Sequence, residues 1–321
     1  MRCGFAFSLL TATALAQSWI PPHAAPDPNQ ALLGRYLFYD QRMSVNGTQS
    51  CASCHRQELA FTDGRAVSIG ATGEPHTRSA MSLVNVVFSS MLTWSDPNLR
   101  SLEKQALRPM LAVHPVELGL RDHESEFLQV VRVDPRYREL FPKAFSCADP
   151  FTMDNVARAL AAFERTIVSA RSPYDRYHYG GDRAAISDAA KRGEVVFFTD
   201  PVAGCYRCHN GFNFTDGQYH NTALHPTDPR KFKTPTLRNV ALTAPYMHDG
   251  SVANLADAID NYAAGGRSPR NSHKDTRLHG FLITPQNKQD LLAFLETLTD
   301  EDLLHDPRFA NPWPPVLGPR P

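Results

Sequence analysis

The chain has 321 residues, which is about two domains by the usual length prior. Hydrophobic residues make up 42% of it, and 33 Lys and Arg residues balance 33 Asp and Glu residues, so the formal net charge is zero. This balance argues against a nucleic acid as a partner. The 25 prolines and 18 glycines follow no fixed period, which excludes a fibre and indicates a loop-rich globular protein.

The N-terminus has the pattern of a secretory signal peptide. A short apolar stretch ends at Leu15, and Ala14-Leu15-Ala16 supplies the small residues of a signal-peptidase site. We therefore predict that residues 1–16 are removed after Ala16 and that the mature protein is periplasmic. A buried N-terminal helix is the alternative interpretation of this stretch. Because the stretch is too short to cross a bilayer and no other segment reaches about 18 apolar residues, we predict no membrane span.

Six cysteines in an exported chain would suggest three disulfides, but their positions favour haem attachment. Residues 51–55 and 205–209 both have the pattern Cys-x-x-Cys-His. In such a motif each thiol can add across a haem vinyl group, and the histidine then binds the iron. A thioredoxin-type pair needs no adjacent histidine, and a zinc site would need two further ligands nearby.

The two motifs predict two covalent c-type haems, with a proximal histidine for each iron. The residues that would hold them are Cys51, Cys54, His55, Cys205, Cys208 and His209. Cys3 would leave with the signal peptide. Cys147 is then left over, and we expect it to be a small buried residue.

The two motifs belong to a longer repeat. They begin at residues 51 and 205, which are 154 residues apart, and Phe-Thr-Asp-Gly follows each of them. Farther along, Ser-Leu-Val-Asn-Val matches Thr-Leu-Arg-Asn-Val, and Trp94 in the first copy then corresponds to His248 in the second. Repeats of this kind indicate that one structural unit occurs twice. We therefore expect two haem domains related by internal duplication.

Hydrophobic spacing indicates a mainly α fold with long loops and cytochrome c-like domains. Residues 156–169 are predicted to form a core helix that leads to a linker, and residues 286–298 a second helix. Segment 172–181, rich in Pro, Tyr and Gly, is the predicted boundary between an N-terminal domain (17–171) and a C-terminal domain (172–321). The prolines after residue 306 predict an irregular tail, and no strand-rich region is evident.

The two copies differ where a second axial ligand would lie. Leu255, Ala258, Ile259 and Tyr262 share one face of a predicted helix, so Tyr262 would point inward and could give a phenolate oxygen to iron. Spacing alone favours the alternative, a core tyrosine with a hydrogen-bonded hydroxyl. The counterpart of Tyr262 is Pro109, which has no ligand atom in its side chain. The N-terminal haem would therefore be open on that face.

With these residues in view, the chain resembles the bacterial di-haem cytochrome c peroxidase and MauG family over nearly all its mature length. Both Cys-x-x-Cys-His motifs match, as do residues 233–250 and 114–119, Glu103-Lys-Gln105 and Pro109. The resemblance implies that the N-terminal haem binds hydrogen peroxide and that the C-terminal haem stores or relays oxidising equivalents.

The resemblance also assigns roles around the haems. It implies a tryptophan between the two haems, matched by Trp94, and a distal-pocket glutamate and glutamine, matched by Glu117 and Gln105. Glu117 would move a proton during O–O cleavage, while Gln105 would hold peroxide or water by hydrogen bonds. The alternatives are a surface or salt-bridged carboxylate for Glu117 and core packing for Trp94.

Two positions favour the MauG-like branch of this family. Tyr262 lies fourteen residues after His248, where cytochrome-dependent peroxidases carry methionine, and the resemblance makes ligation by Tyr262 the favoured interpretation. Those peroxidases also carry a blocking histidine after Ser-Ile-Gly, where this chain has Ala71. The nearby His76 remains a rival ligand for the N-terminal haem.

A calcium ion between the domains is a further implication of the resemblance. Thr243 and Pro245 match the carbonyl donors, but Ser79 takes the place of the family's asparagine. Calcium prefers oxygen ligands, so a serine with waters could still serve.

The resulting prediction is a di-haem oxidase that uses hydrogen peroxide to form a high-valent di-haem state. This state would oxidise, at a distance, an aromatic residue of a partner protein, with tryptophan favoured. Short segments resemble the MauG-like branch that contains the methanobactin-associated enzyme MbnH, which oxidises a tryptophan of its partner MbnP to kynurenine. The alternatives are a peroxidase that takes electrons from a small cytochrome or cupredoxin, and a non-enzymatic electron carrier. Tyr206 is a candidate exit point, with an ordinary edge tyrosine as its alternative.

Overall fold

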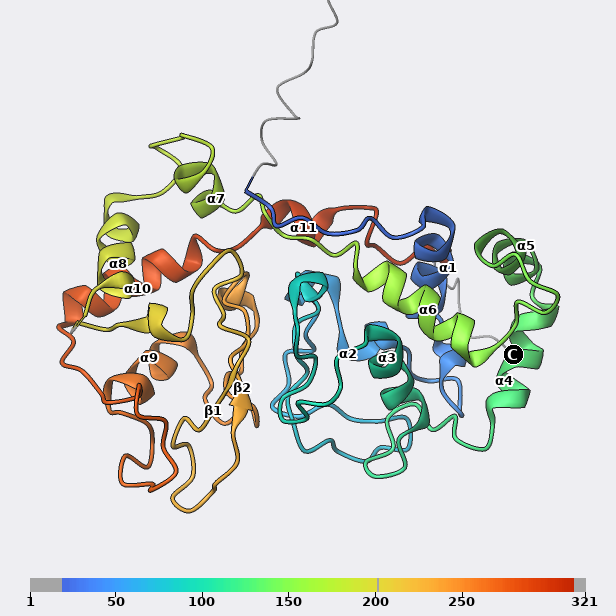
Figure 1. The fold of residues 1–321 in the computed structure, drawn as a ribbon, viewed down its shortest axis with the longest axis horizontal. Coiled ribbons are helices and arrows are strands. Elements are labelled where there is room, and N and C mark those ends of the chain that lie inside the picture. Colours follow the sequence, from blue (N-terminus) through green and yellow to red (C-terminus); the bar gives the residue numbers. More distant parts are fainter. Residues whose placement is uncertain (1–18, 201, 315–321) are drawn as a thin grey trace, which may run out of the picture.

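The computed structural model describes residues 19–200 and 202–314 and has two lobes side by side (Figure 1). The predicted signal peptide lies outside the described residues. The helices of the N-terminal lobe are α1 (Pro28–Tyr39), α2 (Cys51–Cys54), α3 (Leu102–Leu111), α4 (Glu124–Val133), α5 (Pro135–Ala144) and α6 (Met153–Glu164). Those of the C-terminal lobe are α7 (Pro173–His178), α8 (Asp188–Phe198), α9 (Leu255–Ala263) and α10 (Pro285–Glu296), and α11 (Glu301–His305) follows them.

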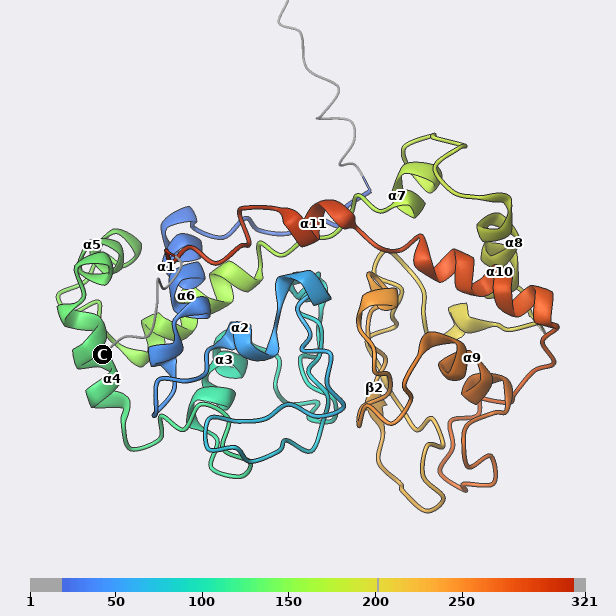
Figure 2. The ribbon, with the colours of Figure 1, turned by 180° about the vertical axis from the view of Figure 1, so that it is seen from behind.

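Sheet is almost absent from the described residues. Two short strands, β1 (Tyr219–His220) and β2 (Phe232–Lys233), form one antiparallel pair in the C-terminal lobe. Long irregular segments connect the remaining helices (Figure 2). The prediction of a mainly α fold with long loops is therefore confirmed, whereas the internal duplication remains a prediction.

Capping residues set where several helices begin. Asp27 accepts backbone N–H groups at the start of α1, and Pro28 follows at a position where a missing N–H costs nothing. Thr152 and Thr284 cap α6 and α10 in the same way. The predicted helix 156–169 therefore begins at Met153, and it ends at Glu164 instead of residue 169, whereas the predicted helix 286–298 corresponds closely to α10.

Each lobe has its own apolar core beside one tightly packed helix pair. In the N-terminal lobe α1 crosses α6, and Gly34 lets the backbones meet. In the C-terminal lobe α8 crosses α10, and Gly193 has the same place. Both cores contain packed aromatic side chains: Phe38, Phe61, Phe163 and Tyr137 in the first, and Phe197, Phe214, Phe294 and Tyr174 in the second.

The C-terminal tail returns to the N-terminal lobe. Leu303, Leu304 and Phe309 belong to the N-terminal core, and the Nε1 of Trp313 donates to the carbonyl of Tyr36 at 3.0 Å. As predicted, the described residues after 306, which are 307–314, are irregular. The C-terminal end of the described chain thus packs against elements far away in sequence.

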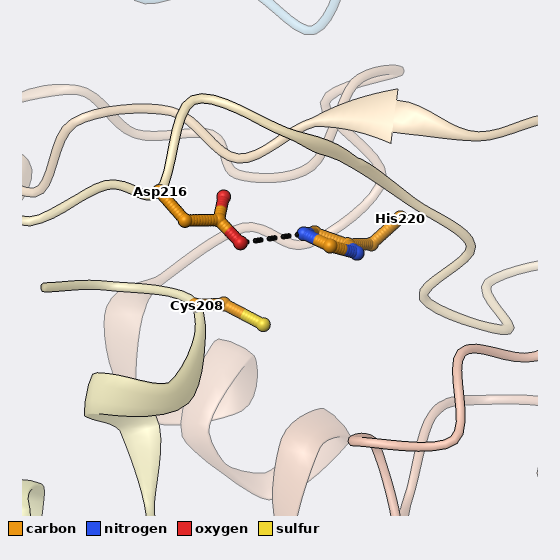
Figure 3. Close-up of side chains that lie close together, drawn as sticks. All are labelled: Cys208, Asp216 and His220. Carbon is orange, nitrogen blue, oxygen red and sulfur yellow. Dashed lines mark hydrogen bonds and ion pairs between the residues drawn. The ribbon is translucent and has the colours of Figure 1, made fainter.

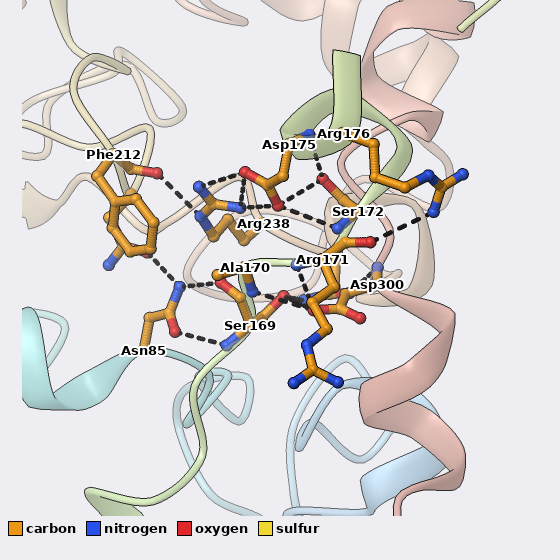
Figure 4. Close-up of polar contacts among 12 residues, drawn as sticks. Asn85, Ser169, Ala170, Arg171, Ser172, Asp175, Arg176, Phe212, Arg238 and Asp300 are labelled. Atoms are coloured by element: carbon orange, nitrogen blue, oxygen red, sulfur yellow. Dashed lines mark hydrogen bonds and ion pairs between the residues drawn. The ribbon is translucent and has the colours of Figure 1, made fainter. Parts of the chain in front are cut away.

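A buried polar network joins the lobes where the chain passes from α6 to α7 (Figure 4). Asp300 accepts the backbone N–H groups of Ala170 and Arg171 and the hydroxyl of Ser169, each at 3.0 Å. Arg238 pairs with Asp175 at 2.9 Å, and the two side chains are 0% and 1% exposed. The predicted boundary segment 172–181 contains α7, whose N-cap is Ser172.

One residue lies where we did not expect it. Cys147 is exposed rather than buried. It follows α5 in the short loop that leads to α6, and its Sγ contacts the carbonyl oxygen of Asp149 at 3.4 Å. A loop that turns at the surface holds its side chains in solvent, which local sequence could not indicate.

No helix in the described part of the chain is long and apolar enough to cross a membrane.

Candidate haem sites

A cavity of about 660 Å³ extends through both lobes and is lined by residues from each. Most residues predicted to serve haem chemistry lie on its wall. These are Cys54, His55, Ser79, Trp94, Gln105, Glu117, Cys205, Cys208, His209, Thr243, Pro245 and Tyr262. Cys51 packs against the N-terminal core one helical turn from Cys54. Two motifs far apart in sequence thus share one internal space.

The first motif is held in a defined orientation. The backbone N–H of His55 donates to the carbonyl of Cys51 at 2.9 Å, which closes the turn. The Nδ1 atom of His55 lies 2.9 Å from the carbonyl oxygen of Phe61, so Nδ1 carries the proton and Nε2 is left without one. Phe61 adopts a φ of 60°, which turns its carbonyl toward the imidazole.

The second motif repeats this arrangement. The N–H of His209 donates to the carbonyl of Cys205 at 2.9 Å, and its Nδ1 lies 3.1 Å from the carbonyl oxygen of Phe214. Phe214 also has a positive φ, 48°. Burial lowers the pKa of both His55 and His209, which favours the neutral imidazole that binds a metal.

The motif cysteines suit thioether formation better than thiolate chemistry. All four are free, and burial raises the pKa of the Cys54 and Cys208 thiols to about 11 and that of Cys205 to about 12. Thiolates that bind zinc or exchange disulfides have lowered pKa values instead. This donor set therefore fits a haem.

The N-terminal side of the cavity bears the predicted distal residues. Gln105 and Pro109 lie one turn apart on α3, and both face the cavity together with Glu117. The rival ligand His76 also lines the cavity, and its Nε2 is 3.6 Å from Oε1 of Glu117. The structure thus brings Gln105 and Glu117 to one site and adds His76 to them.

On the C-terminal side, Tyr262 faces the cavity from α9, which Asn254 caps. Burial raises the pKa of its hydroxyl to about 12. Among the residues that the structure describes, none accepts a hydrogen bond from this hydroxyl or donates one to it. The neighbouring cavity residue Tyr246, by contrast, donates to the carbonyl of Val240 at 3.0 Å. A hydroxyl without a protein partner at a cavity wall fits a ligand better than a packed core tyrosine.

Trp94 connects the two lobes. Its Nε1 donates to the carbonyl of Ser79 at 2.9 Å, and its own carbonyl accepts the N–H of Lys233 from β2 at 2.9 Å. The N–H of Ser79 donates in turn to the carbonyl of His248, the repeat counterpart of Trp94. Trp94 therefore lies at the junction of the lobes, half-buried and facing the cavity.

The residues predicted to bind calcium belong to the same cavity. Ser79, Thr243 and Pro245 all line the cavity. The hydroxyl of Ser79 donates to the carbonyl of Met247 at 3.1 Å, and that of Thr243 to the carbonyl of Val240.

Lys233, which the sequence analysis did not single out, is a buried cation on the cavity wall. It is 7% exposed, and its Nζ contacts Oγ of Ser89 at 3.5 Å. Burial lowers the pKa of its ammonium group to about 8. A poorly compensated ammonium group fits an anionic partner in the cavity, such as a haem carboxylate.

A second set of charges that sequence reasoning missed lies beside Cys208 (Figure 3). His220 is held between Asp216 at 2.8 Å and Asp275 at 2.7 Å, and the guanidinium of Arg277 also contacts its ring. Asp216 belongs to the repeated Phe-Thr-Asp-Gly segment, which was the available signal. Its carboxylate fixes the ring of His220 next to Cys208 of the second Cys-x-x-Cys-His motif.

Comparisons with known proteins agree with this geometry. A family model described as di-haem cytochrome c peroxidase matches residues 28–184. The chain is 34% identical over 283 residues to the methylamine utilization protein MauG of Methylophilus methylotrophus, covering 84% of this chain and 82% of that protein. It is 32% identical over 353 residues to cytochrome-c peroxidase IdrP1 of Pseudomonas sp. strain SCT, covering 94% and 90%.

A solved structure gives the same result. The crystal structure of a MauG-like protein associated with microbial copper homeostasis superposes with a TM-score of 0.88 at 38% identity, covering 92% of this chain and 98% of that chain. Since relatives above 30% identity align over most of both chains, the family and its two haems follow. The chain belongs to the di-haem cytochrome c peroxidase and MauG family, as a MauG-like oxidoreductase that uses peroxide.

Proposed function

We propose that this protein is a periplasmic di-haem oxidase that uses hydrogen peroxide to oxidise an aromatic side chain, tryptophan by preference, on a partner protein. Residues 1–16 would direct export and would then be removed after Ala16. The observation that carries the proposal is Tyr262, which lines the cavity and whose hydroxyl has no hydrogen-bond partner among the described residues. The MauG-like neighbour associated with copper homeostasis supports a place near the MbnH branch, whose partner is MbnP.

The two haems would be covalently attached through the four motif cysteines, with His55 and His209 as proximal ligands. When bound, they supply the reaction with peroxide and the storage of two oxidising equivalents. The carbonyls of Phe61 and Phe214 hold the two imidazoles so that Nε2 is the free donor. Lys233 would then balance a haem carboxylate.

Glu117 and Gln105 would handle peroxide on the N-terminal side. Glu117 would take a proton from one oxygen of peroxide and return it to the other, which would leave as water. The amide of Gln105 holds peroxide by a hydrogen bond. Pro109, one turn from Gln105, leaves room for peroxide because its side chain has no ligand atom.

Tyr262 would give the C-terminal iron an anionic oxygen ligand. Such a ligand favours oxidised iron, whereas methionine raises the reduction potential and favours Fe(II). A site of this kind is poorly suited to accept electrons from an ordinary cytochrome. It is well suited to share oxidising equivalents with the N-terminal site through Trp94, which lies at the junction of the lobes.

The substrate is proposed to be oxidised at a distance by electron transfer. The side chain of the partner would stay outside the cavity, so the electron would leave the partner at the surface. Tyr206 is a candidate exit point, since it lies in the second motif and its hydroxyl donates to Asp200 at 2.8 Å near the surface. Calcium bound near Ser79, Thr243 and Pro245 remains part of the proposal, with waters completing its ligands.

The test compares Tyr262→Met with a matched control, Tyr246→Phe. Both tyrosines line the cavity, but the hydroxyl of Tyr246 is already donated to Val240. Electron paramagnetic resonance of the wild-type holoenzyme should show one high-spin and one low-spin ferric haem, and one equivalent of peroxide should remove both signals. Tyr246→Phe should behave like wild type, while Tyr262→Met should lose the paired response and partner oxidation. Intact partner oxidation by Tyr262→Met would contradict the ligand assignment.

A second candidate function is peroxide reduction with electrons from a small cytochrome or cupredoxin. Its support is the likeness to cytochrome c peroxidases, of which IdrP1 is 32% identical. Rapid reduction of the wild-type protein by a cytochrome donor, with steady peroxide turnover, would favour this function over partner oxidation.

A further inference from the structure

The segment that carries His76 is a small hairpin fixed against the loop that carries Glu117. Residues 68–76 fold back on themselves, with a β-bridge between Ile69 and Pro75 and a hydrogen bond from the N–H of His76 to the carbonyl of Ser68 at 2.8 Å. His76 therefore lies at the end of the hairpin where the two arms are hydrogen-bonded, so its backbone is held in place.

Three contacts hold this hairpin on the loop at 114–119. The N–H of Ala71 donates to the carbonyl of Glu117 at 2.7 Å, and the N–H of Val116 donates to Oε2 of Glu74 at 2.9 Å. Gly70 approaches so closely that a Cβ there would lie 1.8 Å from the carbonyl oxygen of Val116. Because backbone meets backbone, the hairpin and the loop have little freedom to separate.

The orientation of the imidazole follows from its two neighbours. The N–H of Arg78 donates to Nδ1 of His76 at 3.0 Å, so in the neutral ring the proton resides on Nε2. That Nε2 faces Oε1 of Glu117 at 3.6 Å, slightly beyond hydrogen-bond length, and a small rotation would close the distance. The side chains are 29% and 37% exposed and both face the cavity, so they meet inside the peroxide site.

We infer that His76 is a positioning residue for Glu117 and not an iron ligand. Nε2 of His76 holds Oε1 of Glu117, which leaves Oε2 to exchange the proton with peroxide. This inference rests on the proposed function, because it assigns a role within the same peroxide site. Sequence reasoning treated His76 as a rival ligand, since the hairpin that turns it toward Glu117 could not be derived from local spacing.

Charged groups around the pair determine its pH dependence. The Glu117 carboxylate raises the pKa of His76, while burial opposes that rise. Glu74 and Arg78 are on the same segment as His76, His114 is on the loop of Glu117, and Arg108 lines the cavity from α3. Protonation costs the ring the hydrogen bond from Arg78 but gives it an ion pair with Glu117, so the raised pKa places the titration of His76 at a higher pH than that of a free histidine.

The experiment measures the rate of reaction with peroxide by stopped-flow absorbance, from pH 5 to 9, in holoenzyme variants. His76→Ala should react about 10- to 100-fold more slowly, because the carboxylate loses its orientation. His76→Gln places an amide N–H near the Nε2 position, so it should recover most of the rate but lose the pH-dependent limb due to histidine. The double variant His76→Ala with Glu117→Gln should be no slower than Glu117→Gln alone. His123→Ala, an exposed histidine outside the cavity, is the control.

Each alternative outcome is distinct. An unchanged rate and pH profile in His76→Ala would overturn the inference, as would a His76→Gln rate no better than that of His76→Ala. Two low-spin haems in the resting wild type, with one becoming high-spin in His76→Ala, would instead make His76 an iron ligand. If the wild type and the His123→Ala control both fail to react with peroxide, the proposed function is refuted, and so is the role of His76 that rests on it.

Discussion

One glycine in each lobe allows two helices to cross closely. We expect replacement of either glycine to lower stability, and replacement of only one of them to affect a haem site. A Cβ at Gly34 in α1 would lie 1.9 Å from the carbonyl oxygen of Ala159 in α6. A Cβ at Gly193 in α8 would lie 1.9 Å from the carbonyl oxygen of Asp290 in α10. Ordinary contact begins at 3.4 Å, so each alanine requires a shift of 3.4 − 1.9 = 1.5 Å.

The magnitude follows from two opposing effects. Alanine in a helix is favoured over glycine by about 1 kcal/mol. Overpacking costs about 1–3 kcal/mol and occasionally more, and the rigid backbone carbonyl places these sites at or above the upper end. We therefore expect Gly34→Ala and Gly193→Ala each to lose about 2 kcal/mol, or about 4–8 °C in Tm for a lobe of this size. Ser125→Ala, at an exposed position of α4, should change stability by less than about 0.5 kcal/mol.

The two variants should differ in their effect on the haem sites. Leu291 and Leu295 of α10 line the cavity, whereas no described residue of α1 or α6 does. Gly193→Ala should therefore alter the spectrum of the low-spin haem, while Gly34→Ala leaves it unchanged. Thermal unfolding by circular dichroism and resting-state electron paramagnetic resonance measure the two effects. Equal or raised stability in either variant would refute the steric reasoning, and an altered spectrum in Gly34→Ala would refute the separation of the sites.

Two further predictions concern buried charges. Glu164 is buried, one of its carboxylate oxygens has no hydrogen-bond partner among the described residues, and burial raises its pKa to about 8. The stability that this group contributes is complete below about pH 4.5 and is lost as the pH rises to 8. In thermal unfolding, the free energy of unfolding of Glu164→Gln should therefore equal that of wild type at pH 4. At pH 9 it should be higher than that of wild type, by at most about 5 kcal/mol. In denaturant titrations, Arg238→Met should lower the free energy of unfolding by about 3–5 kcal/mol, because it leaves Asp175 charged and buried. The double variant with Asp175→Leu should restore part of this loss. A Glu164→Gln difference independent of pH, or an Arg238→Met loss below about 1 kcal/mol, would contradict these assignments.

Features encoded over short stretches could be predicted from the sequence. The haem motifs and the spacing of α9 each depend on residues within one or two helical turns, and the structure places Tyr262 on the cavity wall as that spacing requires. The helix 286–298 was predicted closely from the spacing of its leucines, and in the structure Thr284 and Pro285 set its start. The end of α6 at Glu164 was not predicted. The segment that follows it binds Asp300 through Ser169 and Ala170, and this contact with a distant residue is not visible in the local sequence.

Features that depend on distant segments could not be predicted. The contact of His76 with Glu117 joins residues 41 positions apart (117 − 76 = 41) through a hairpin that packs on a loop. Lys233 is buried because β2 pairs with β1 and donates to Trp94, and nothing in its neighbours along the chain indicates this. In each case the side chain's environment comes from another part of the chain, which hydrophobic periodicity does not describe.

The two haem sites share a scaffold and differ in a few side chains. Asn85 and Asn239 occupy equivalent places in the repeat, have φ values of 59° and 61°, and both donate to Ser169 at the junction of the lobes. His55 and His209 are oriented by equivalent carbonyls as well. The backbone therefore presents two similar proximal sites, and the difference in chemistry must come from the distal side. There, one site has a proline beside a carboxylate held by His76, and the other has a tyrosine hydroxyl with no protein partner among the described residues. If one site binds peroxide and the other stores oxidising equivalents, as we propose, both can arise from one scaffold, because the residues that distinguish the sites lie on the cavity wall.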